Sequence, residues 1–143
     1  MVLCSTGLFL AGPSGSGKSG LALGLIACAI NKGHFAALIS DDQTLIGKTR
    51  DGRLVASAPP TLFGMAEWRG TGILPVATPL SHAILHLALK PADMTGVDRV
   101  PEAGLIHDIG SGLSLPAMAV RMNDPALVWT AIAAAHPHLL PVF

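Results

Sequence analysis

An eight-residue stretch near the start of the chain constrains the fold more than any other feature. Residues 12–19 read GPSGSGKS and fit the phosphate-binding pattern GxxxxGK[ST] without a mismatch. An apolar segment, residues 7–11, precedes the stretch, and a helix-like segment, residues 20–30, follows it. A strand, a glycine-rich loop and a helix in this order let backbone N–H groups converge on a polyphosphate at the helix N-terminus. The stretch therefore predicts a phosphate-binding loop in an α/β fold.

The residue types within this loop suit a nucleotide. Its glycines permit backbone angles and a close approach that a Cβ would hinder. Lys18 would supply positive charge to the outer phosphates, and the Ser19 hydroxyl would bind Mg²⁺. The residues that we expect to bind the nucleotide are Gly12, Pro13, Ser14, Gly15, Ser16, Gly17, Lys18 and Ser19.

The composition predicts one compact domain over residues 1–143, because half of the residues are apolar and only 13% are charged. Lys plus Arg and Asp plus Glu balance at nine each, so no basic field indicates a nucleic-acid partner. The longest apolar run, residues 21–30, is too short to span a bilayer. Cys4 and Cys28 are expected to be buried free thiols, which favours a reducing, cytoplasmic compartment.

Further elements follow the first helix. Residues 35–39 are expected to form a buried strand that ends at an acidic pair. Residues 43–49 and 53–57 are typical of a hairpin, because an Asp-Gly turn signal separates them. Residues 62–76 are irregular by pattern.

The second half of the chain is less distinct. Residues 80–89 fit a strand or a helix, and we favour a strand. Residues 91–112 are polar and turn-rich, which indicates a loop over the active face. Residues 113–120 are expected to be an edge strand, because Pro116 interrupts them.

Capping residues mark where the two helices end or begin. The apolar helix over residues 20–30 has Gly33 as its C-terminal cap. A last helix over residues 126–135 has Asp124 at its N-cap and Pro125 at its first helical position.

Asp41 and Asp42 are the first candidates for chemistry beyond phosphate binding. They would lie beside the phosphate loop if the strand before them neighbours the strand before the loop. One carboxylate could then accept a hydroxyl proton while the other holds metal-bound water. The alternative is that the pair merely begins the hairpin. The loop upstream favours the functional interpretation.

Glu67 and Arg69 are the second pair of candidates. A glutamate is a hard oxygen ligand for Mg²⁺, and an arginine offers a planar fork for phosphate. Residues two apart share one face of an extended backbone, so both side chains could point at one site. Spacing alone leaves a solvent-exposed ion pair between them as an alternative.

Three stretches in this order resemble the HPr kinase/phosphorylase family, in particular its short, single-domain proteobacterial form. They are GPSGSGKS, the ISDD of residues 39–42, and the EWRGTG of residues 67–72, which matches the family's E-x-R-G-x-G signature. The resemblance covers about residues 7–121. It implies a P-loop-containing mixed sheet with flanking helices, like the nucleotide-binding half of phosphoenolpyruvate carboxykinase.

The resemblance also implies an activity: an ATP- and Mg²⁺-dependent protein-serine kinase, with phosphorolysis as its reverse, acting on an HPr-like phosphocarrier in the regulation of carbohydrate metabolism. Family members are typically hexamers, and neither a membrane nor a nucleic acid is expected as a partner. Asp41 would be the base toward the target serine, with Asp42 beside it. Glu67 would hold metal, Arg69 would stabilise the transferring charge, and Arg99 resembles a family arginine in a mobile loop.

Two departures from the family pattern bear on activity. The family usually has an acidic residue directly after the loop serine, where this chain has Gly20. A histidine that the family places about fifteen residues before the loop has no counterpart, because only eleven residues precede Gly12. A catalytically impaired nucleotide-binding regulator is therefore the alternative function. A small-metabolite P-loop kinase is a lesser one, because such kinases usually carry an arginine-rich lid, and the late part of this chain offers only Arg99 and Arg121.

Overall fold

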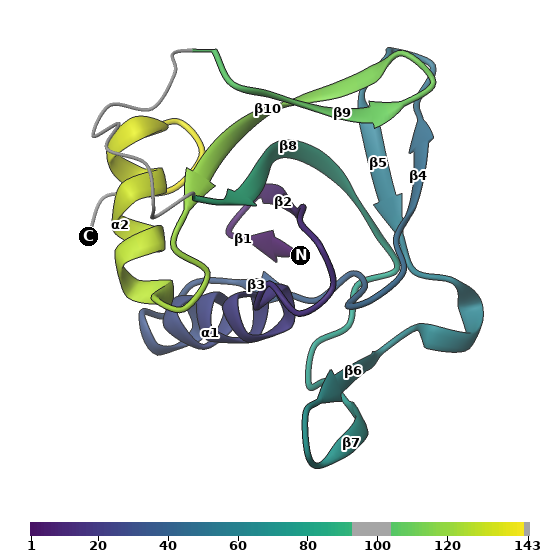
Figure 1. The fold of residues 1–143 in the computed structure, drawn as a ribbon, viewed down its shortest axis with the longest axis vertical. Helices are drawn as coiled ribbons and strands as arrows, with labels where there is room; N and C mark the ends of the chain where they lie inside the picture. The colour runs from purple at the N-terminus through teal and green to yellow at the C-terminus, as the bar shows by residue number, and fades with distance from the viewer. Residues whose placement is uncertain (93–103, 142–143) are drawn as a thin grey trace.

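A computed structural model describes residues 1–92 and 104–141 of the chain (Figure 1). Two helices, α1 (Lys18–Asn31) and α2 (Pro125–Ala135), pack on each other beside a mixed sheet, and a short 3-10 turn covers Pro60–Leu62. The strands are β1 (Val2–Leu3), β2 (Thr6–Leu10), β3 (Ala36–Ala37), β4 (Leu45–Lys48), β5 (Leu54–Ser57), β6 (Met65–Trp68), β7 (Gly72–Pro75), β8 (His82–Pro91), β9 (Ile106–Gly110) and β10 (Leu113–Val120).

The main sheet has the order β3-β1-β2-β8-β10-β9, and the β4–β5 hairpin joins it along the first part of β8. β8 runs parallel to both β2 and β10, whereas β1, β3, β5 and β9 pair with antiparallel neighbours. The expected α/β class with a mixed sheet and flanking helices is therefore confirmed. The preference for a strand over residues 80–89 is confirmed too, as β8.

Two apolar clusters hold these layers together. The larger one joins α1 and α2 to the sheet through buried side chains such as Leu21, Leu25 and Trp129. The smaller one lies between the β4–β5 hairpin and the sheet and includes Leu54 and Leu115. Each layer therefore buries apolar surface against the sheet, which is the main favourable contribution to folding.

The predicted caps are confirmed. The N–H of His34 donates to Ala29 O and that of Gly33 donates to Ile30 O, each over 2.9 Å, which is the Schellman arrangement at the end of α1. At the start of α2, Asp124 Oδ1 accepts from the Leu127 N–H over 3.0 Å, and Pro125 occupies the first helical position. α1 begins at Lys18, two residues before its expected start.

The expected pairing of the strand after α1 is wrong. The regular strand is only Ala36–Ala37, and β1 lies between it and β2. Val2 and Leu3 pair with both neighbours, because the chain reverses between β1 and β2 through Cys4, whose φ is 55°. β1 therefore occupies the edge of β2 that the strand after α1 would have taken.

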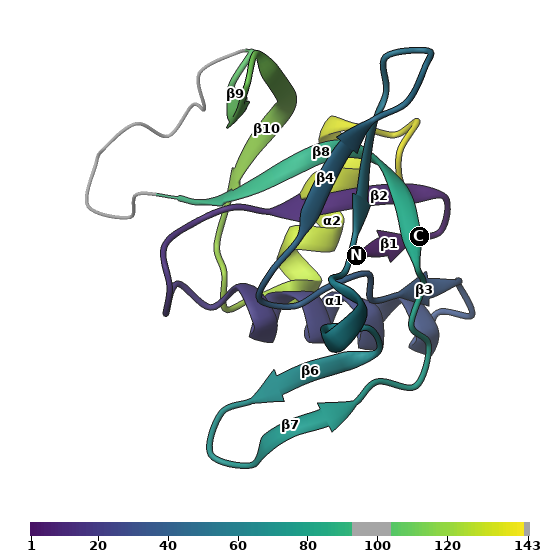
Figure 2. The ribbon, with the colours of Figure 1, turned by 90° about the vertical axis from the view of Figure 1, so that its right-hand side faces the viewer.

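The β4–β5 hairpin is confirmed, with Gly52 in its turn, but residues 62–76 are not irregular. They contain the antiparallel hairpin β6–β7, in which Glu67 pairs with Ile73 and Trp68 with Gly72. All four residues of β7 are exposed, so no buried face produces the alternation by which a strand is recognised in a sequence. Figure 2 shows this hairpin extending past α1.

β10 spans the predicted residues, but it is not an edge strand, because β9 pairs along its other side. β9 lies within residues 91–112, which were expected to be a loop. The Ala117 N–H donates to Leu105 O, on the β9 side, so the nitrogen of Pro116 faces β8. Pairing with β8 begins only at Ala117, and the missing N–H of Pro116 therefore breaks no ladder bond.

No helix within residues 1–92 and 104–141 is long and apolar enough to cross a membrane. Cys4 and Cys28 are both free, as expected, but they are half-buried rather than buried, and both pack against the larger apolar cluster.

Candidate functional site

The predicted phosphate loop connects β2 to α1, so the strand, loop and helix follow one another as the sequence pattern requires. Gly12 has a φ of 142°, and a Cβ there would lie 2.9 Å from Cγ of Pro91 at the end of β8. Only glycine fits this position without a shift of its neighbours. The loop therefore takes its shape partly from its own sequence and partly from the strand beside it.

Lys18 reaches back over the loop. Its Nζ donates to Gly12 O and to Pro13 O, each over 2.8 Å, which places the ammonium at the strand end of the loop. The buried Ser16 Oγ has no hydrogen-bond partner among the described residues. An acceptor oxygen of a ligand bound by the loop would satisfy this hydroxyl. The position of the Lys18 ammonium suits a bound phosphate chain.

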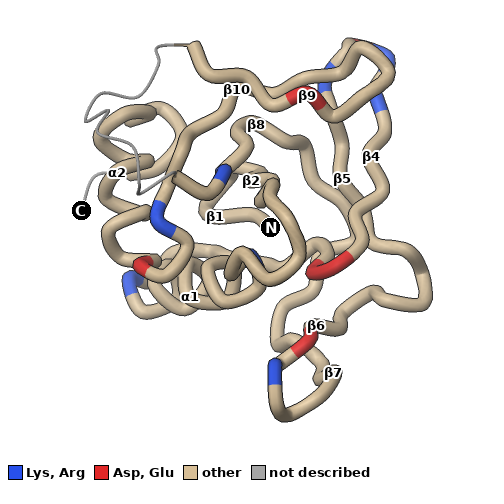
Figure 3. Tube along the Cα trace, viewed as in Figure 1, with Lys and Arg blue, Asp and Glu red and all other residues tan. Residues whose placement is uncertain are grey.

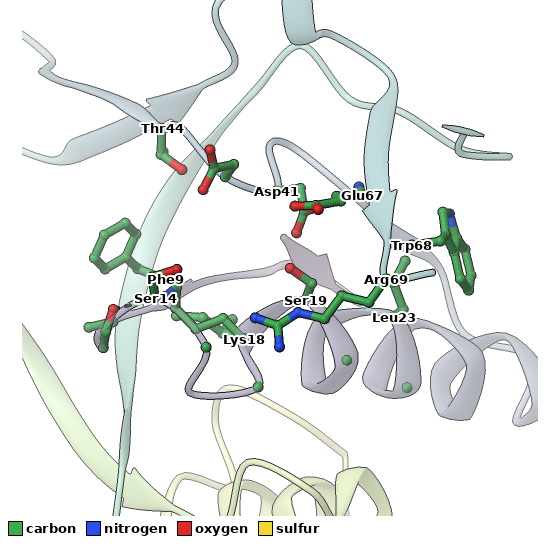
Figure 4. Close-up of a pocket in the computed structure, with 18 of the residues that line it drawn as sticks. Phe9, Ser14, Lys18, Ser19, Leu23, Asp41, Thr44, Glu67, Trp68 and Arg69 are labelled. Carbon is green, nitrogen blue, oxygen red and sulfur yellow. Dashed lines mark hydrogen bonds between the residues drawn. The ribbon is translucent and has the colours of Figure 1, made fainter. Parts of the chain in front are cut away.

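The acidic pair lies at the same cleft as the loop, although its strand is not the neighbour of β2. Asp41 Oδ2 accepts a hydrogen bond from the Glu67 backbone N–H over 2.8 Å. Figure 4 shows Asp41 and Glu67 side by side above Ser19. In the trace, the acidic positions before β4 and on β6 lie close together (Figure 3). The hydrogen bond joins the hairpin β6–β7 to the segment that carries the acidic pair.

Arg69 extends from the turn of this hairpin toward the loop (Figure 4). A Cβ added to Gly15 would lie 3.7 Å from Arg69 Nη2, so the guanidinium is beside the loop backbone. Within the described part of the chain, Glu67 and Arg69 form no ion pair with each other; the ion pair found there joins Arg53 to Asp51. The arrangement favours the site over the exposed ion pair that spacing alone allowed.

Most of these groups line one cleft of about 940 Å³. Pro13 and Ser16 belong to the loop but do not line the cleft, and Arg99 lies outside the described residues. The other residues of the predicted site line it together: Gly12, Ser14, Gly15, Gly17, Lys18, Ser19, Asp41, Asp42, Glu67 and Arg69. These residues come from three separate segments, 12–19, 41–42 and 67–69, so it is the fold that brings them to one cleft.

Sequence reasoning did not predict several residues of the cleft wall, among them Phe9 and His107. Their rings stack with centroids 5.6 Å apart, one from β2 and the other from β9. Burial lowers the pKa of His107, and the charge of Lys90 lowers it further. No sequence signal marked the pair, because β9 itself was not recognised and Phe9 read as an ordinary strand residue.

The donors around Ser19 suit Mg²⁺. The Ser19 hydroxyl and the carboxylate of Glu67 are hard oxygen ligands. Residues 1–92 and 104–141 hold no group of three or more His, Cys, Asp or Glu side chains placed to bind a metal by themselves.

Comparison with known proteins agrees with this geometry. A family model, the HPr Serine kinase C-terminal domain, matches residues 1–84. An HPr kinase/phosphorylase from Bordetella petrii is 37% identical over 136 residues, which cover 88% of this chain and 41% of the relative. Another from an Exiguobacterium species is 42% identical over 143 residues, covering 93% of this chain and 44% of the relative. The chain thus spans less than half the length of these relatives.

The solved structure of the Hpr(Ser) kinase/phosphatase from Coxiella burnetii superimposes with a TM-score of 0.72. The match covers 96% of this chain and 92% of that one at 24% sequence identity. At this identity the match shows a shared fold.

Proposed function

The chain belongs to the family of HPr serine kinase C-terminal domains, and from this membership we propose that it is an ATP-dependent kinase. Its substrate would be a serine of an HPr-like phosphocarrier. The observation that carries the proposal is that the acidic pair and the hairpin β6–β7, joined by the hydrogen bond from the Glu67 N–H to Asp41, line the same cleft as the phosphate loop. Phosphoryl transfer requires a base, positive charge and a phosphate cradle together, and the carboxylates, the cations and the glycine-rich loop that line this cleft support these roles.

In the proposed reaction, Asp41 accepts the proton of the serine hydroxyl as its oxygen attacks the γ-phosphorus of ATP. The bond from the γ-phosphorus to the bridging oxygen breaks, and ADP leaves. The loop N–H groups, Lys18 and Arg69 stabilise the charge that spreads over the phosphate oxygens. Ser19 and Glu67, with Asp42 positioning bound water, would hold Mg²⁺, which supplies further neutralisation of that charge when bound.

The same proposal extends to the cofactors, the partner, the compartment and the assembly of the enzyme. ATP and Mg²⁺ are its cofactors, an HPr-like carrier is its partner, and residues 1–143 act as one kinase domain. The two free cysteines support a reducing, cytoplasmic compartment. The family resemblance supports a homo-oligomer, a hexamer, as the assembly, and Arg99 as a further group that reaches the phosphate.

Incubation with an HPr-like carrier and radiolabelled ATP tests the proposal. We expect Mg²⁺-dependent transfer of label to a carrier serine, and no transfer with a Lys18→Ala variant. Transfer absent from the wild type, under conditions where ATP binds, would refute the catalytic claim.

The alternative, a nucleotide-binding regulator without turnover, draws support from Gly20. A Cβ at this position meets no atom within 4 Å, so an acidic side chain would fit the cleft there without a clash. If its absence impairs catalysis, Gly20→Asp should raise the transfer rate or change its metal dependence, whereas the uncharged Gly20→Asn should not. The same transfer rate and metal dependence in both variants and the wild type would contradict this explanation.

A further inference from the structure

The cleft has two ends, and the phosphate loop lies between them. At one end stand Phe9 and its stacked partner His107. At the other, the wall is formed by Gly20, Leu23 and Ala27 of α1 and by Trp68 of β6. Figure 4 shows Phe9 and Trp68 on opposite sides, with Lys18 and Ser19 between them.

Trp68 lies on the face of the hairpin that is directed toward α1. It is two residues from Ala66 on the same strand, so the two side chains share a face. Ala66 is buried in the larger apolar cluster with Leu21 and Leu25 of α1. Trp68 lies beyond that buried contact and remains 42% exposed. A large indole in a cleft wall is apolar surface that a ligand can cover.

The loop determines which end of the cleft a nucleoside would occupy. The ammonium of Lys18, held at Gly12 O and Pro13 O, marks the outer-phosphate end. The inner phosphates lie at the helix N-terminus, after Ser19. The ribose would therefore extend from the inner phosphates along the first turn of α1. The space beside Gly20 is open there, because this residue has no Cβ. Along the helix axis, Leu23 lies about 4.5 Å beyond Gly20 and Ala27 about 10.5 Å beyond it.

We propose that Trp68, with Leu23 and Ala27 below it, forms the slot for the base of the bound nucleotide. This rests on the proposed function, because the base is placed by the phosphates. The indole offers a flat π-face for stacking, and the two α1 side chains offer an apolar floor. The opposite end, beside the outer phosphate, is left for the acceptor protein, whose hydroxyl must reach the γ-phosphorus.

A comparison of ATP with inorganic tripolyphosphate, each with Mg²⁺, separates base binding from phosphate binding. We expect Trp68→Leu to weaken ATP binding roughly tenfold, the loss typical of one stacked base, and to leave tripolyphosphate binding unchanged. The matched control is Ile73→Ala, which removes an apolar side chain that is 62% exposed on the same hairpin and does not line the cleft. It should bind both ligands as the wild type does.

Tryptophan fluorescence gives a second readout, because the chain has two tryptophans and Trp129 is fully buried. Acrylamide quenching therefore reports on Trp68. ATP should protect it and tripolyphosphate should not, and Trp68→Leu should lose the ATP-dependent change while keeping the Trp129 signal of a folded protein.

Equal protection by both ligands, or unchanged ATP affinity in Trp68→Leu, would overturn the slot and leave the proposed function standing. A raised KM for the carrier with unchanged ATP affinity would assign Trp68 to carrier docking and likewise overturn the slot. Failure of the wild type to bind either ligand would refute the proposed function and the slot together.

Discussion

The backbone N–H of Glu67 donates to Asp41 Oδ2 over 2.8 Å, across a separation of 26 residues. This bond connects the segment after β3 to the hairpin β6–β7 and leaves Asp41 Oδ1 for another partner. Since Arg69 follows Glu67 by two residues, the same bond positions its guanidinium near Gly15. Asp41 is thus a structural anchor as well as the proposed base, and the two roles can be separated by mutation.

Asp41→Asn should abolish transfer and leave the hairpin in place. The amide oxygen can still accept from the Glu67 N–H, but the side chain can no longer take the serine proton. We expect the rate of transfer to fall at least about 10²-fold, with ATP affinity nearly unchanged. Asp41→Ala, which loses both functions, should also weaken nucleotide binding. Calorimetry and a transfer assay measure the two effects, and an Asn variant with wild-type transfer would exclude Asp41 as the base.

Arg69→Gln should slow transfer much more than it weakens ATP binding. Arginines that stabilise a transferring phosphoryl group contribute about 10³-fold or more to the rate, because they act on charge that develops in the transition state. The matched control is Arg53→Gln, since Arg53 is ion-paired to Asp51 in the β4–β5 turn and does not line the cleft. Similar losses in both variants, measured as kcat with labelled ATP, would argue against a role for Arg69 in transfer.

Gly24→Ala should destabilise the protein, because α1 and α2 approach closely there. The new Cβ would lie 2.3 Å from Cγ of the rigid Pro125 ring. Overpacking typically costs about 1–3 kcal/mol, offset by up to about 1 kcal/mol of improved helix propensity. The same change at Gly20, where a Cβ meets nothing within 4 Å, should be neutral or stabilising. Urea unfolding of both variants tests this, and equal midpoints would contradict the close packing.

The stability should fall as the pH is lowered through the range in which His107 titrates. Burial, and then the charge of Lys90, lower the pKa of His107 in the folded state. The unfolded chain therefore takes up a proton at a higher pH, near the ordinary histidine pKa of about 6.5, and folding is disfavoured below it. The contribution is complete above that pH and is lost as the pH falls through the folded pKa. His107→Gln should show a shallower decline in unfolding free energy between pH 8 and pH 5 (roughly the range set by a histidine pKa).

The local features of this protein were predictable from its sequence, because they depend on neighbouring residues alone. The phosphate loop needs glycines, a lysine and a serine at fixed spacing, and residues 12–19 supply them. The Gly33 and Asp124 caps satisfy backbone groups of their own helices. The β4–β5 hairpin needed only its turn signal. The acidic pair, Glu67 and Arg69 were likewise recognised as candidates from their residue types and order, although the hairpin that carries Glu67 and Arg69 was not.

Tertiary structure decided which of these parts meet. The insertion of β1 between β2 and β3, and the pairing of β9 with β10, depend on ladders between distant segments that no local pattern reveals. The stack of Phe9 on His107 follows only once β9 is placed. The sequence alone determined that a phosphate-loop motif, three candidate carboxylates and an arginine were present. Only the folded chain placed Asp41, Glu67 and Arg69 at that loop, because their hydrogen bonds and contacts close over separations that sequence spacing does not encode.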